Sequence, residues 1–457
     1  MRRTTSSARH CFSSAPTKAE TVTSTLPPVR TLLSRFACEA ASPPSVVQSC
    51  LRMLDVTHQR GDTVVTRIHE ECARAAASDA ERRWAGGDAR PLEGIPFVVK
   101  DNIDVAGYPT TAGTAGELYV AVRSAHVVDE YLSLGAVLIG TAAMTEYAYA
   151  VSEVGLRASL PNNAFDGRTV GGSTSGGAAA VAMGACSFAI GTDTGGSVRL
   201  PAAYQSVSGL RVSRELFGTR GVVPLSSTLD GIGFVAASPA DLADVLAPVF
   251  IRARASRMDQ SVHRRTRVGV IDPSEHDVPG DDAVMDKFAL AVDRLSVECD
   301  VVPGPAIPNL VECEATNSLI LEYEFARFVR SDERNGLLAD TRDALSRGDE
   351  IGWQDYTRAL ARMRAMQLGT SQWWEQCDYL VVPTTSIGAP LLSDGAALDT
   401  VAVTLTSPWN LLDLPAVSVP IGRVCGNGVS AQIIGPRGDD EGCIELADTW
   451  FKLLHPS

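Results

Sequence analysis

The most informative part of this chain runs from Thr169 to Tyr204 and reads TVGGSTSGGAAAVAMGACSFAIGTDTGGSVRLPAAY. It holds two turns rich in glycine and serine, at residues 171–177 and 192–197, which are separated by small residues and then an apolar segment. The 24 residues from Thr169 to Thr192 carry no charge, but six glycines and several hydroxyl side chains make them too polar to span a bilayer. This pattern predicts tightly packed backbone, with a helix and then a strand between the turns.

Both turns have a composition that suits the binding of an anion. Glycine permits positive φ and close backbone approach, and successive N–H groups in such turns form an anion-binding nest. Ser197 ends the second turn, so its hydroxyl would lie beside the N–H groups that stabilise an acyl-transfer oxyanion. A phosphate-binding loop and a purely structural turn stay open as alternatives, although neither GxxxxGK[ST] nor GxGxxG is present.

A serine nucleophile needs a base, and no histidine lies near either turn in the sequence. Lys100 is a candidate, because it ends the apolar run Ile95–Val99 and burial would lower the pKa of its ammonium group. Its spacing alone is more typical of a surface lysine, so the assignment needs further support.

Segments with strand and helix patterns alternate along the rest of the chain. Short apolar runs predict strands at Ile95–Lys100, Ala136–Ile139, Val268–Ile271, Tyr379–Val382 and Ala416–Val419. Periodicity and helix-forming residues predict helices at Arg67–Trp84, His126–Leu134, Leu319–Val329 and Gln354–Gln367. This alternation predicts an α/β fold whose sheet is covered by helices on both faces.

The composition narrows the class of protein. The chain has 457 residues, of which 45% are hydrophobic, and its net charge of −14 disfavours direct binding to nucleic acid or an anionic membrane. Ten scattered cysteines form no CxxC pair and no cluster with zinc spacing. We therefore expect free thiols, a cytoplasmic location, and no metal or cofactor.

The first 28 residues differ from the remainder. Basic residues precede the first acid, Glu20, and eleven serines or threonines fall within the first 25 positions. No apolar segment suggests a secretory signal, whereas the Arg- and Ser-rich, acid-poor pattern is typical of an organelle transit peptide. We expect residues 1–28 to form a flexible tail or a transit-like segment, and globular sequence to begin near Val29.

The two serine turns, in order after the lysine segment, resemble the signature region of the amidase signature family. The resemblance rests on GGSTSGGAAAVA and GTDTGGSVRLPA, and GIPFVVKDNIDVAG at 94–107 is similar to the family's lysine segment. GAVLIGTAAMTEYA, TSPWNLLDLPAVSVP and GVSAQIIGPRGDDEGCIELA resemble further segments, so the match extends from about Leu92 to Ala447. The resemblance implies one large α/β domain, 29–457, with a central mixed, twisted sheet.

The family shares a Ser–cis-Ser–Lys triad. Carried over by position, the resemblance implies that Ser197 is the nucleophile, Ser173 the bridging serine after a cis peptide bond, and Lys100 the terminal base. Neutral Lys100 would accept a proton from Ser173, which would accept the proton of Ser197 as it attacks the amide carbon. Water would then hydrolyse the acyl-enzyme through the same relay.

The resemblance also assigns residues around the nucleophile. It implies an oxyanion hole built from the backbone N–H groups of Thr194, Gly195 and Gly196. Asp193 and Arg199 occupy flanking positions that are typical of the family, where we expect support rather than proton transfer.

The sequence departs from the family's usual pattern at several positions outside the triad. Thr174 replaces the second of two serines, Ser175 replaces a common glycine, and Val170 stands where proline is frequent. Val212 replaces a proline, and Asp413 replaces a glycine in a late segment. These changes bear on the substrate pocket, so no specificity is transferred from the family.

The resemblance implies an amidase that cleaves the carbon–nitrogen bond of a small, linear amide or urea-type substrate. Two alternatives stay open: the A subunit of a glutamine-dependent tRNA amidotransferase, which releases ammonia for a partner, and an amide-forming acyltransferase of secondary metabolism. Both would use the same acyl-enzyme. A small-molecule amide is the expected partner, and a homodimer stays open.

Overall fold

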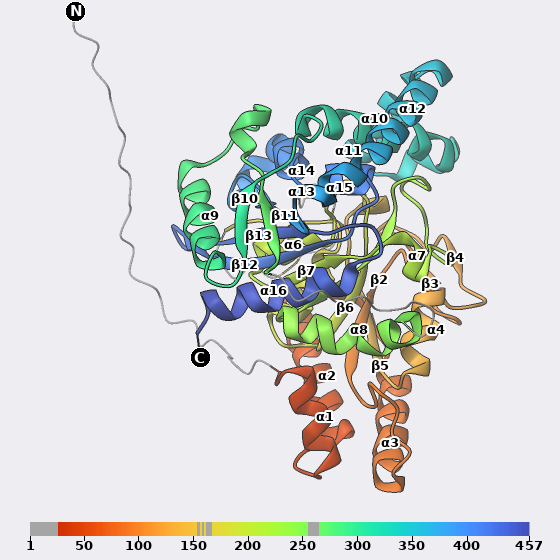
Figure 1. Ribbon diagram of the computed structural model, residues 1–457. Coiled ribbons are helices and arrows are strands. Elements are labelled where there is room, and N and C mark those ends of the chain that lie inside the picture. Colours follow the sequence, from red (N-terminus) through yellow and green to blue (C-terminus); the bar gives the residue numbers. More distant parts are fainter. Residues whose placement is uncertain (1–25, 153–155, 158–159, 161–166, 255–264, 457) are drawn as a thin grey trace, which may run out of the picture.

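An 11-stranded sheet runs through the centre of the computed structural model, which describes residues 26–152, 156–157, 160, 167–254 and 265–456 (Figure 1). The strands lie in the order β1 (Val65–Ile68), β5 (Val137–Ala142), β2 (Pro96–Lys100), β6 (Phe188–Asp193), β8 (Gly231–Ala236), β7 (Ser208–Arg211), β12 (Ala416–Val424), β13 (Asn427–Ile434), β11 (Tyr379–Pro383), β9 (Arg267–Val270) and β10 (Asp300–Pro303). A separate hairpin joins β3 (Pro109–Thr110) to β4 (Tyr119–Val120).

The sheet is mixed, as expected. Strand β2 runs parallel to both β5 and β6, and β11, β9 and β10 form a second parallel group. The pairs between β6, β8, β7, β12 and β13 are antiparallel, as are the pairs β1–β5 and β13–β11.

Helices cover both faces of this sheet, which confirms the predicted α/β class. One face packs against α1 (Val29–Ala37), α4 (His126–Ser133), α8 (Pro239–Arg254), α9 (Asp282–Leu295) and α16 (Asp440–Leu454). The other face packs against α2 (Pro43–Gln59), α3 (Glu70–Gly86) and α5 (Ser175–Ala182) in the region of β1, β5, β2 and β6, and against α6 (Arg199–Tyr204) in the region of β7, β12 and β13.

A further group of helices lies at the top of the molecule in Figure 1. It comprises α10 (Leu310–Phe328), α11 (Ala339–Glu350), α12 (Trp353–Gly369), α13 (Trp373–Gln376), α14 (Asp399–Val403) and α15 (Ser407–Leu411), and the short α7 (Arg214–Phe217) lies at the side. Helix α10 packs against α11, α12 and α15.

The central strands place the site residues by simple alternation. Every residue of β2, β5 and β6 is buried, as is usual for strands covered on both faces. Phe97 and Val99 pack into the core beneath α8, whereas Val98 packs into the core beneath α5. Since side chains two residues apart share a face, Lys100 follows Val98 and points toward the α5 side.

One predicted helix begins too early. The segment Arg67–Trp84 has helical periodicity, but Arg67 and Ile68 belong to strand β1, where they pair with Thr141 and Gly140. The helix α3 itself begins at Glu70 and ends at Gly86, with Gly87 in the left-handed conformation after it. Strand pairing with β5 therefore overrides the local helical pattern at the first residues of the segment.

Val29 is anchored at the start of the first helix. Its backbone N–H donates to Asp241 Oδ1 at 2.8 Å, and its side chain is buried at the start of α1. Leu26 also packs against a core cluster, and the carbonyl of Pro28 accepts from the N–H of Leu32. Residues 1–25 of the predicted tail lie outside the described residues, so its role stays a prediction.

We predict that deletion of residues 2–25 leaves folding and catalysis intact. The cut is made before Leu26, because Leu26 and Pro28 both contact the folded chain. The melting temperature and the rate of amide turnover should match those of the full chain. A shortened protein that folds normally but turns over no substrate would show that the tail contributes to the site.

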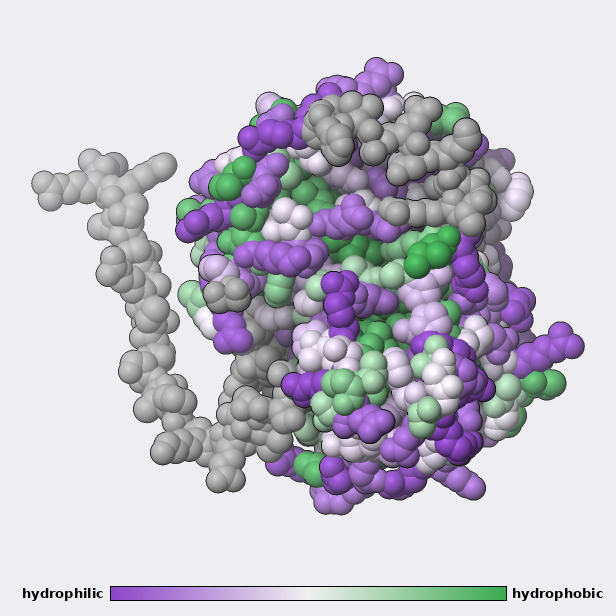
Figure 2. Space-filling model, turned by 60° about the horizontal axis from the view of Figure 1, so that its bottom comes forward, coloured by the Kyte–Doolittle hydropathy of each residue, from purple (hydrophilic) through white to green (hydrophobic). Residues whose placement is uncertain are grey.

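No helix in the described parts of the chain is long and apolar enough to cross a membrane. The face seen in Figure 2 carries hydrophilic side chains with apolar ones interspersed among them.

Candidate active site

Lys100 lies at the end of β2 and is fully buried. Its Nζ is 2.7 Å from Ser173 Oγ, 2.8 Å from Thr192 Oγ1 and 3.3 Å from the Thr192 carbonyl oxygen. The structure therefore brings together two of the predicted triad residues, which are separated by 73 positions in the sequence. Thr192, which the sequence did not single out as a site residue, completes the contacts of the amine.

Burial lowers the pKa of Lys100 to about 7, and the negative charges of Asp230 and Asp193 oppose this shift only in part. An ordinary lysine has a pKa of about 10.4. The amine is therefore largely neutral at mildly alkaline pH, which a proton acceptor requires.

The contacts of Nζ allow the lone pair of a neutral amine to face Ser173. A neutral amine has two N–H donors, and both oxygens of Thr192 can accept them. Asn102 Nδ2 donates to Thr192 Oγ1 as well, at 3.1 Å, which holds that hydroxyl in place. The remaining lone pair then faces Ser173 Oγ, so the Ser173 hydroxyl can donate its proton to Lys100.

Ser173 lies in the first turn, just before α5. The Gly172–Ser173 peptide bond is cis, which confirms that expectation. Position 172 must be glycine, because a Cβ there would lie 2.9 Å from the Ala150 carbonyl oxygen. The predicted helix follows as α5, which packs equally closely against the residues beside β1 and β5, since a Cβ on Gly176 would meet the carbonyl oxygens of Val64 and Ala143.

Ser197 lies in the second turn, which follows the end of β6 at Asp193. The N–H of Thr174 donates to the Ser197 carbonyl oxygen at 3.0 Å, so the two serine turns are joined directly after Ser173. Ser197 is 5% exposed and lines a cavity, which leaves this predicted nucleophile reachable by a small molecule.

The side chain of Asp193 stabilises the second turn. Its carboxylate forms a buried ion pair with Arg199 at 2.9 Å and accepts from Asn410 Nδ2 at 2.9 Å. Burial alone would raise the pKa of Asp193, but Arg199 and the hydrogen bonds outweigh it and hold that pKa well below its ordinary value. A carboxylate held ionised by such contacts supports the turn and is unsuited to proton transfer, in line with the expected role.

The predicted oxyanion hole changes in one respect. We expected the N–H of Gly196 to be free to bind an oxyanion. It instead donates to Asp193 Oδ1 at 2.9 Å. We therefore propose the N–H groups of Thr194 and Gly195 as the principal donors to an oxyanion. Gly196 has a φ of +125°, a conformation that favours glycine. A Cβ at this position would clash with Thr406 Oγ1, which would lie only 2.2 Å away.

Asp230 is a buried residue beside the turn that the sequence did not indicate. Its Oδ1 accepts from Thr194 Oγ1 at 2.6 Å and its carboxylate accepts from the N–H groups of Leu225 and Ser226. Burial raises the pKa of Asp230 to about 6. Asp230 therefore positions Thr194 and adds negative charge near Lys100.

We predict that Arg199→Met lowers the free energy of unfolding by about 3–5 kcal/mol, because it leaves the buried carboxylate of Asp193 unpaired. Arg199 is fully buried and also donates to Gln432 and Asn410, so those acceptors lose partners too. Urea unfolding measures the effect. The matched control is Arg358→Met, which removes an exposed ion pair with Asp355 and should cost less than about 1 kcal/mol. Equal stability of the two variants would contradict the account.

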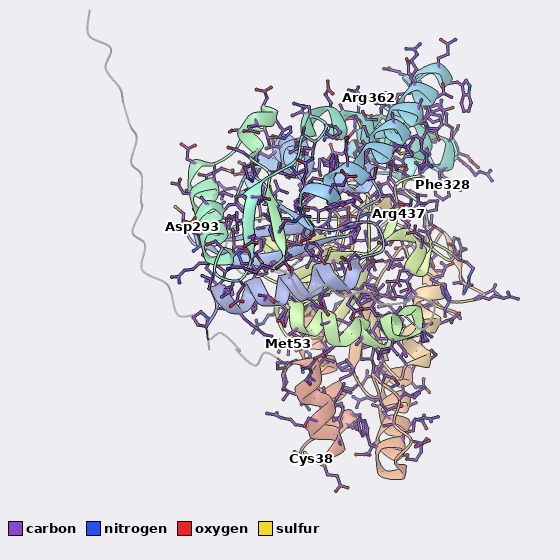
Figure 3. All side chains as sticks on the ribbon, in the orientation of Figure 1. Cys38, Met53, Asp293, Phe328, Arg362 and Arg437 are labelled. Carbon is purple, nitrogen blue, oxygen red and sulfur yellow. The ribbon has the colours of Figure 1, made fainter. Side chains whose placement is uncertain are left out.

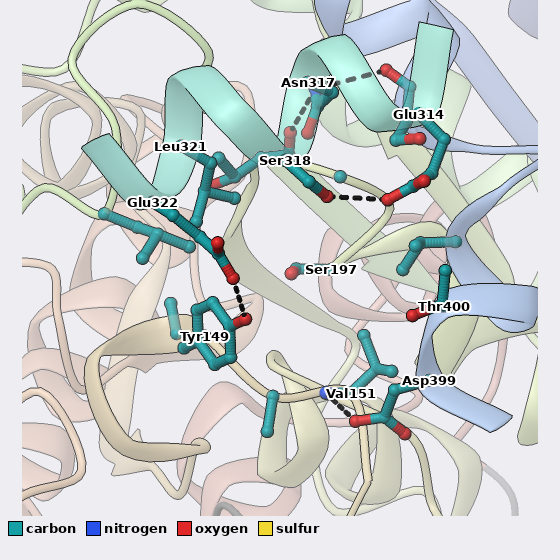
Figure 4. Close-up of a pocket in the computed structure, with 17 residues that line it drawn as sticks. Tyr149, Val151, Ser197, Glu314, Asn317, Ser318, Leu321, Glu322, Asp399 and Thr400 are labelled. Atoms are coloured by element: carbon teal, nitrogen blue, oxygen red, sulfur yellow. Dashed lines mark hydrogen bonds between the residues drawn. The ribbon is translucent and has the colours of Figure 1, made fainter. Parts of the chain in front are cut away.

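The cavity around Ser197 has a volume of about 110 Å³. Figure 4 shows the Ser197 side chain in the middle, with Glu314 and Ser318 of α10 above it, Glu322 of α10 to its left, and Tyr149, Val151 and Asp399 below it. Thr194 and Gly195 also line it, so the proposed oxyanion donors and the predicted nucleophile line the same cavity. None of the acidic residues of this cavity was singled out from the sequence.

Among the described residues, no group of three or more His, Cys, Asp or Glu side chains is placed to hold a metal ion. The nine cysteines in this part of the chain are all free.

Comparisons with known proteins agree with this geometry. The family model Amidase matches residues 45–444. The A subunit of the glutamyl-tRNA(Gln) amidotransferase of Deinococcus deserti is 32% identical, covering 82% of this chain and 87% of that protein. The fatty acid amide hydrolase of Medicago truncatula is 28% identical over 94% of this chain and 76% of its own length. A solved amidase structure superposes with a TM-score of 0.83 at 26% identity, covering 93% of this chain and 99% of that one. The chain therefore belongs to the amidase signature family, whose hydrolases act on carbon–nitrogen bonds.

Proposed function

We propose that this chain cleaves an amide carbon–nitrogen bond through an acyl-enzyme on Ser197. The observation that carries the proposal is the buried contact between Lys100 Nζ and Ser173 Oγ, 2.7 Å long, in which burial lowers the pKa of the lysine to about 7. A buried neutral amine beside a serine hydroxyl is a base able to take up a proton at ordinary pH.

The proposed reaction has two halves. Ser173 passes its proton to Lys100 and accepts the proton of Ser197, whose Oγ attacks the carbonyl carbon. The oxyanion that forms is stabilised by the N–H groups of Thr194 and Gly195, which the Asp193 and Asp230 contacts hold in place. The proton then returns to the leaving amine, and water cleaves the acyl-enzyme by the same route in reverse.

For the substrate we propose a small amide, hydrolysed by the chain without a partner. The cavity supports this choice, because Glu314, Glu322 and Asp399 line it and no lysine, arginine or histidine does so among the described residues. The α-carboxylate of glutamine would find no cationic side chain there.

The curated relatives favour a second candidate. Several of them are A subunits of glutamyl-tRNA(Gln) amidotransferases, at 30–32% identity and with 82–92% of this chain covered. On that proposal the chain would release ammonia from glutamine for partner subunits.

Ammonia release separates the two candidates. The purified chain is offered primary amides, ureido acids and glutamine, with the Ser197→Ala variant as the control. Turnover of simple amides by the chain alone supports the first candidate. Turnover that is restricted to glutamine and requires added amidotransferase partner subunits supports the second. Amide turnover that persists undiminished in Ser197→Ala would overturn both.

A further inference from the structure

Two carboxyl groups in the Ser197 cavity form no ion pair within the described chain. Glu314 accepts a hydrogen bond from Ser318 Oγ at 2.6 Å, and Asp399 accepts from Ser152 Oγ at 3.1 Å and from the Val151 N–H at 3.3 Å. Figure 4 shows them both to the right of Ser197 but on different elements, α10 and α14. Both are held by neutral donors, which leaves their charge uncompensated.

The third carboxylate of the cavity differs, because it is already neutralised. Glu322 pairs with Arg347 at 2.7 Å and accepts from Tyr149 Oη at 2.7 Å. The charges that shift the pKa values of the other two carboxyl groups are also negative: Glu322 raises the pKa of Glu314, and Asp340 raises the pKa of Asp399.

This arrangement is costly in the absence of a cation. Burial raises the pKa of Asp399 to about 6 and raises that of Glu314, which shows that their charged forms are poorly solvated. A buried carboxylate is stabilised when an opposite charge lies within a few ångströms. Because no group of three ligating side chains exists in the described chain, a bound metal ion is a poor fit for this role.

A buried hydroxyl in the same cavity also points to a ligand. Ser407 lines the cavity and is 2% exposed, and its Oγ has no hydrogen-bond partner in the described structure. Its Cβ is 3.8 Å from where a Cβ on Gly195 would lie, which places it beside the oxyanion turn. Buried hydroxyls are usually paired, so a polar group of the substrate is the expected partner.

We propose that the substrate is an amide that carries a protonated amine, whose ammonium group is bound by one of the two carboxylates, Glu314 above Ser197 or Asp399 below it in Figure 4. Ser407 contacts a polar group near the scissile amide. The proposal deepens the proposed function and rests on it for the position of the reacting carbonyl at Ser197. An ammonium group suits these carboxylates because it supplies both the opposite charge and N–H donors.

Two matched series of amides test the position and charge of the cation. In the acyl series, 5-aminopentanamide is compared with hexanamide and with the monoamide of adipic acid, which differ only in the terminal ammonium, methyl or carboxylate group. In the amine series, N-(4-aminobutyl)acetamide is compared with N-pentylacetamide. We expect the cationic member of one series to have a kcat/KM roughly 10- to 100-fold above its neutral counterpart, the size of a hydrogen-bonded charge contact.

Of the variants Glu314→Gln and Asp399→Asn, the one at the carboxylate that binds the ammonium group should remove most of that preference and leave turnover of the neutral amide nearly unchanged. A preference that survives in both variants would overturn the inference. Each is isosteric and can still accept the hydrogen bonds that Ser318 and Ser152 donate. The matched control is Glu312→Gln on the same helix as Glu314, which should leave the preference unchanged. Glu312 forms an exposed ion pair with Arg362, and Figure 3 shows Arg362 at the outside of the molecule.

Binding to the inactive Ser197→Ala variant gives a second readout that needs no turnover. Calorimetry should show the cationic amide binding more tightly than its neutral partner, and adding the Glu314→Gln or Asp399→Asn change that removed the preference in turnover should abolish the difference. Equal binding and equal turnover of cationic and neutral members in both series would overturn this inference, while leaving the proposed function intact if Ser197 is required. Turnover that does not require Ser197 would instead overturn the proposed function.

Discussion

Ser197→Ala should reduce amide turnover by on the order of 10⁴- to 10⁶-fold, the loss found when a serine hydrolase loses its nucleophile. The variant removes only Oγ from a residue whose backbone carbonyl still accepts from Thr174, so the two turns should stay joined. Turnover under substrate saturation measures the loss, and the melting temperature should be close to that of the parent.

Ser175→Ala is the matched control for this prediction. Ser175 lies in the first turn and is buried, and its hydroxyl has no hydrogen-bond partner in the described structure. Its loss should therefore leave activity near normal. A fluorophosphonate probe should label Ser197 alone. Labelling that survives in Ser197→Ala would mean that another serine is the nucleophile.

Lys100→Ala should lower kcat/KM by roughly 10²- to 10⁴-fold, the usual contribution of a positioned proton acceptor. The same change should remove the acid limb of the pH profile. Below a pH of about 7 the parent's lysine is protonated and cannot accept from Ser173, so activity falls as the pH decreases; above that value the amine is neutral and activity reaches its plateau.

Lys100→Arg should not restore the rate, because a guanidinium group stays protonated. Lys100→Met fills the same buried space without a titrating group, and it separates loss of the base from loss of packing. A methionine variant with a near-normal rate and an unchanged pH profile would show that a different group is the base.

Local sequence patterns could predict the elements that place the triad. The apolar run before Lys100 predicts a strand, which the structure has as β2, and the glycine turns around Ser173 and Ser197 predict the helix and strand that become α5 and β6. These features succeed because buried strands and glycine-dependent turns have strong local signals. The pairing of Lys100 with Ser173 rested on the family resemblance, since nothing in the spacing brings those two residues together.

Other parts of the site depend on contacts that no local pattern encodes. Asp230 directly precedes β8, and it meets Thr194 only because β8 pairs with β6 in the sheet. Glu314 and Asp399 line the same cavity although they are 85 positions apart in the sequence (399 − 314). The early start predicted for the helix at Arg67 fails for the same reason, because pairing with β5 decides that segment.

Whether Lys100 activates Ser197 through Ser173 can be measured directly from the rate at which a fluorophosphonate labels Ser197 at different pH values. This measurement needs no knowledge of the substrate. The labelling rate of the parent should rise from acid pH to a plateau with a midpoint near 7, following the pKa of Lys100. Labelling of Lys100→Met should be slow and should lack that step. A parent profile with no step in this range, or the same profile in both proteins, would contradict this role of Lys100.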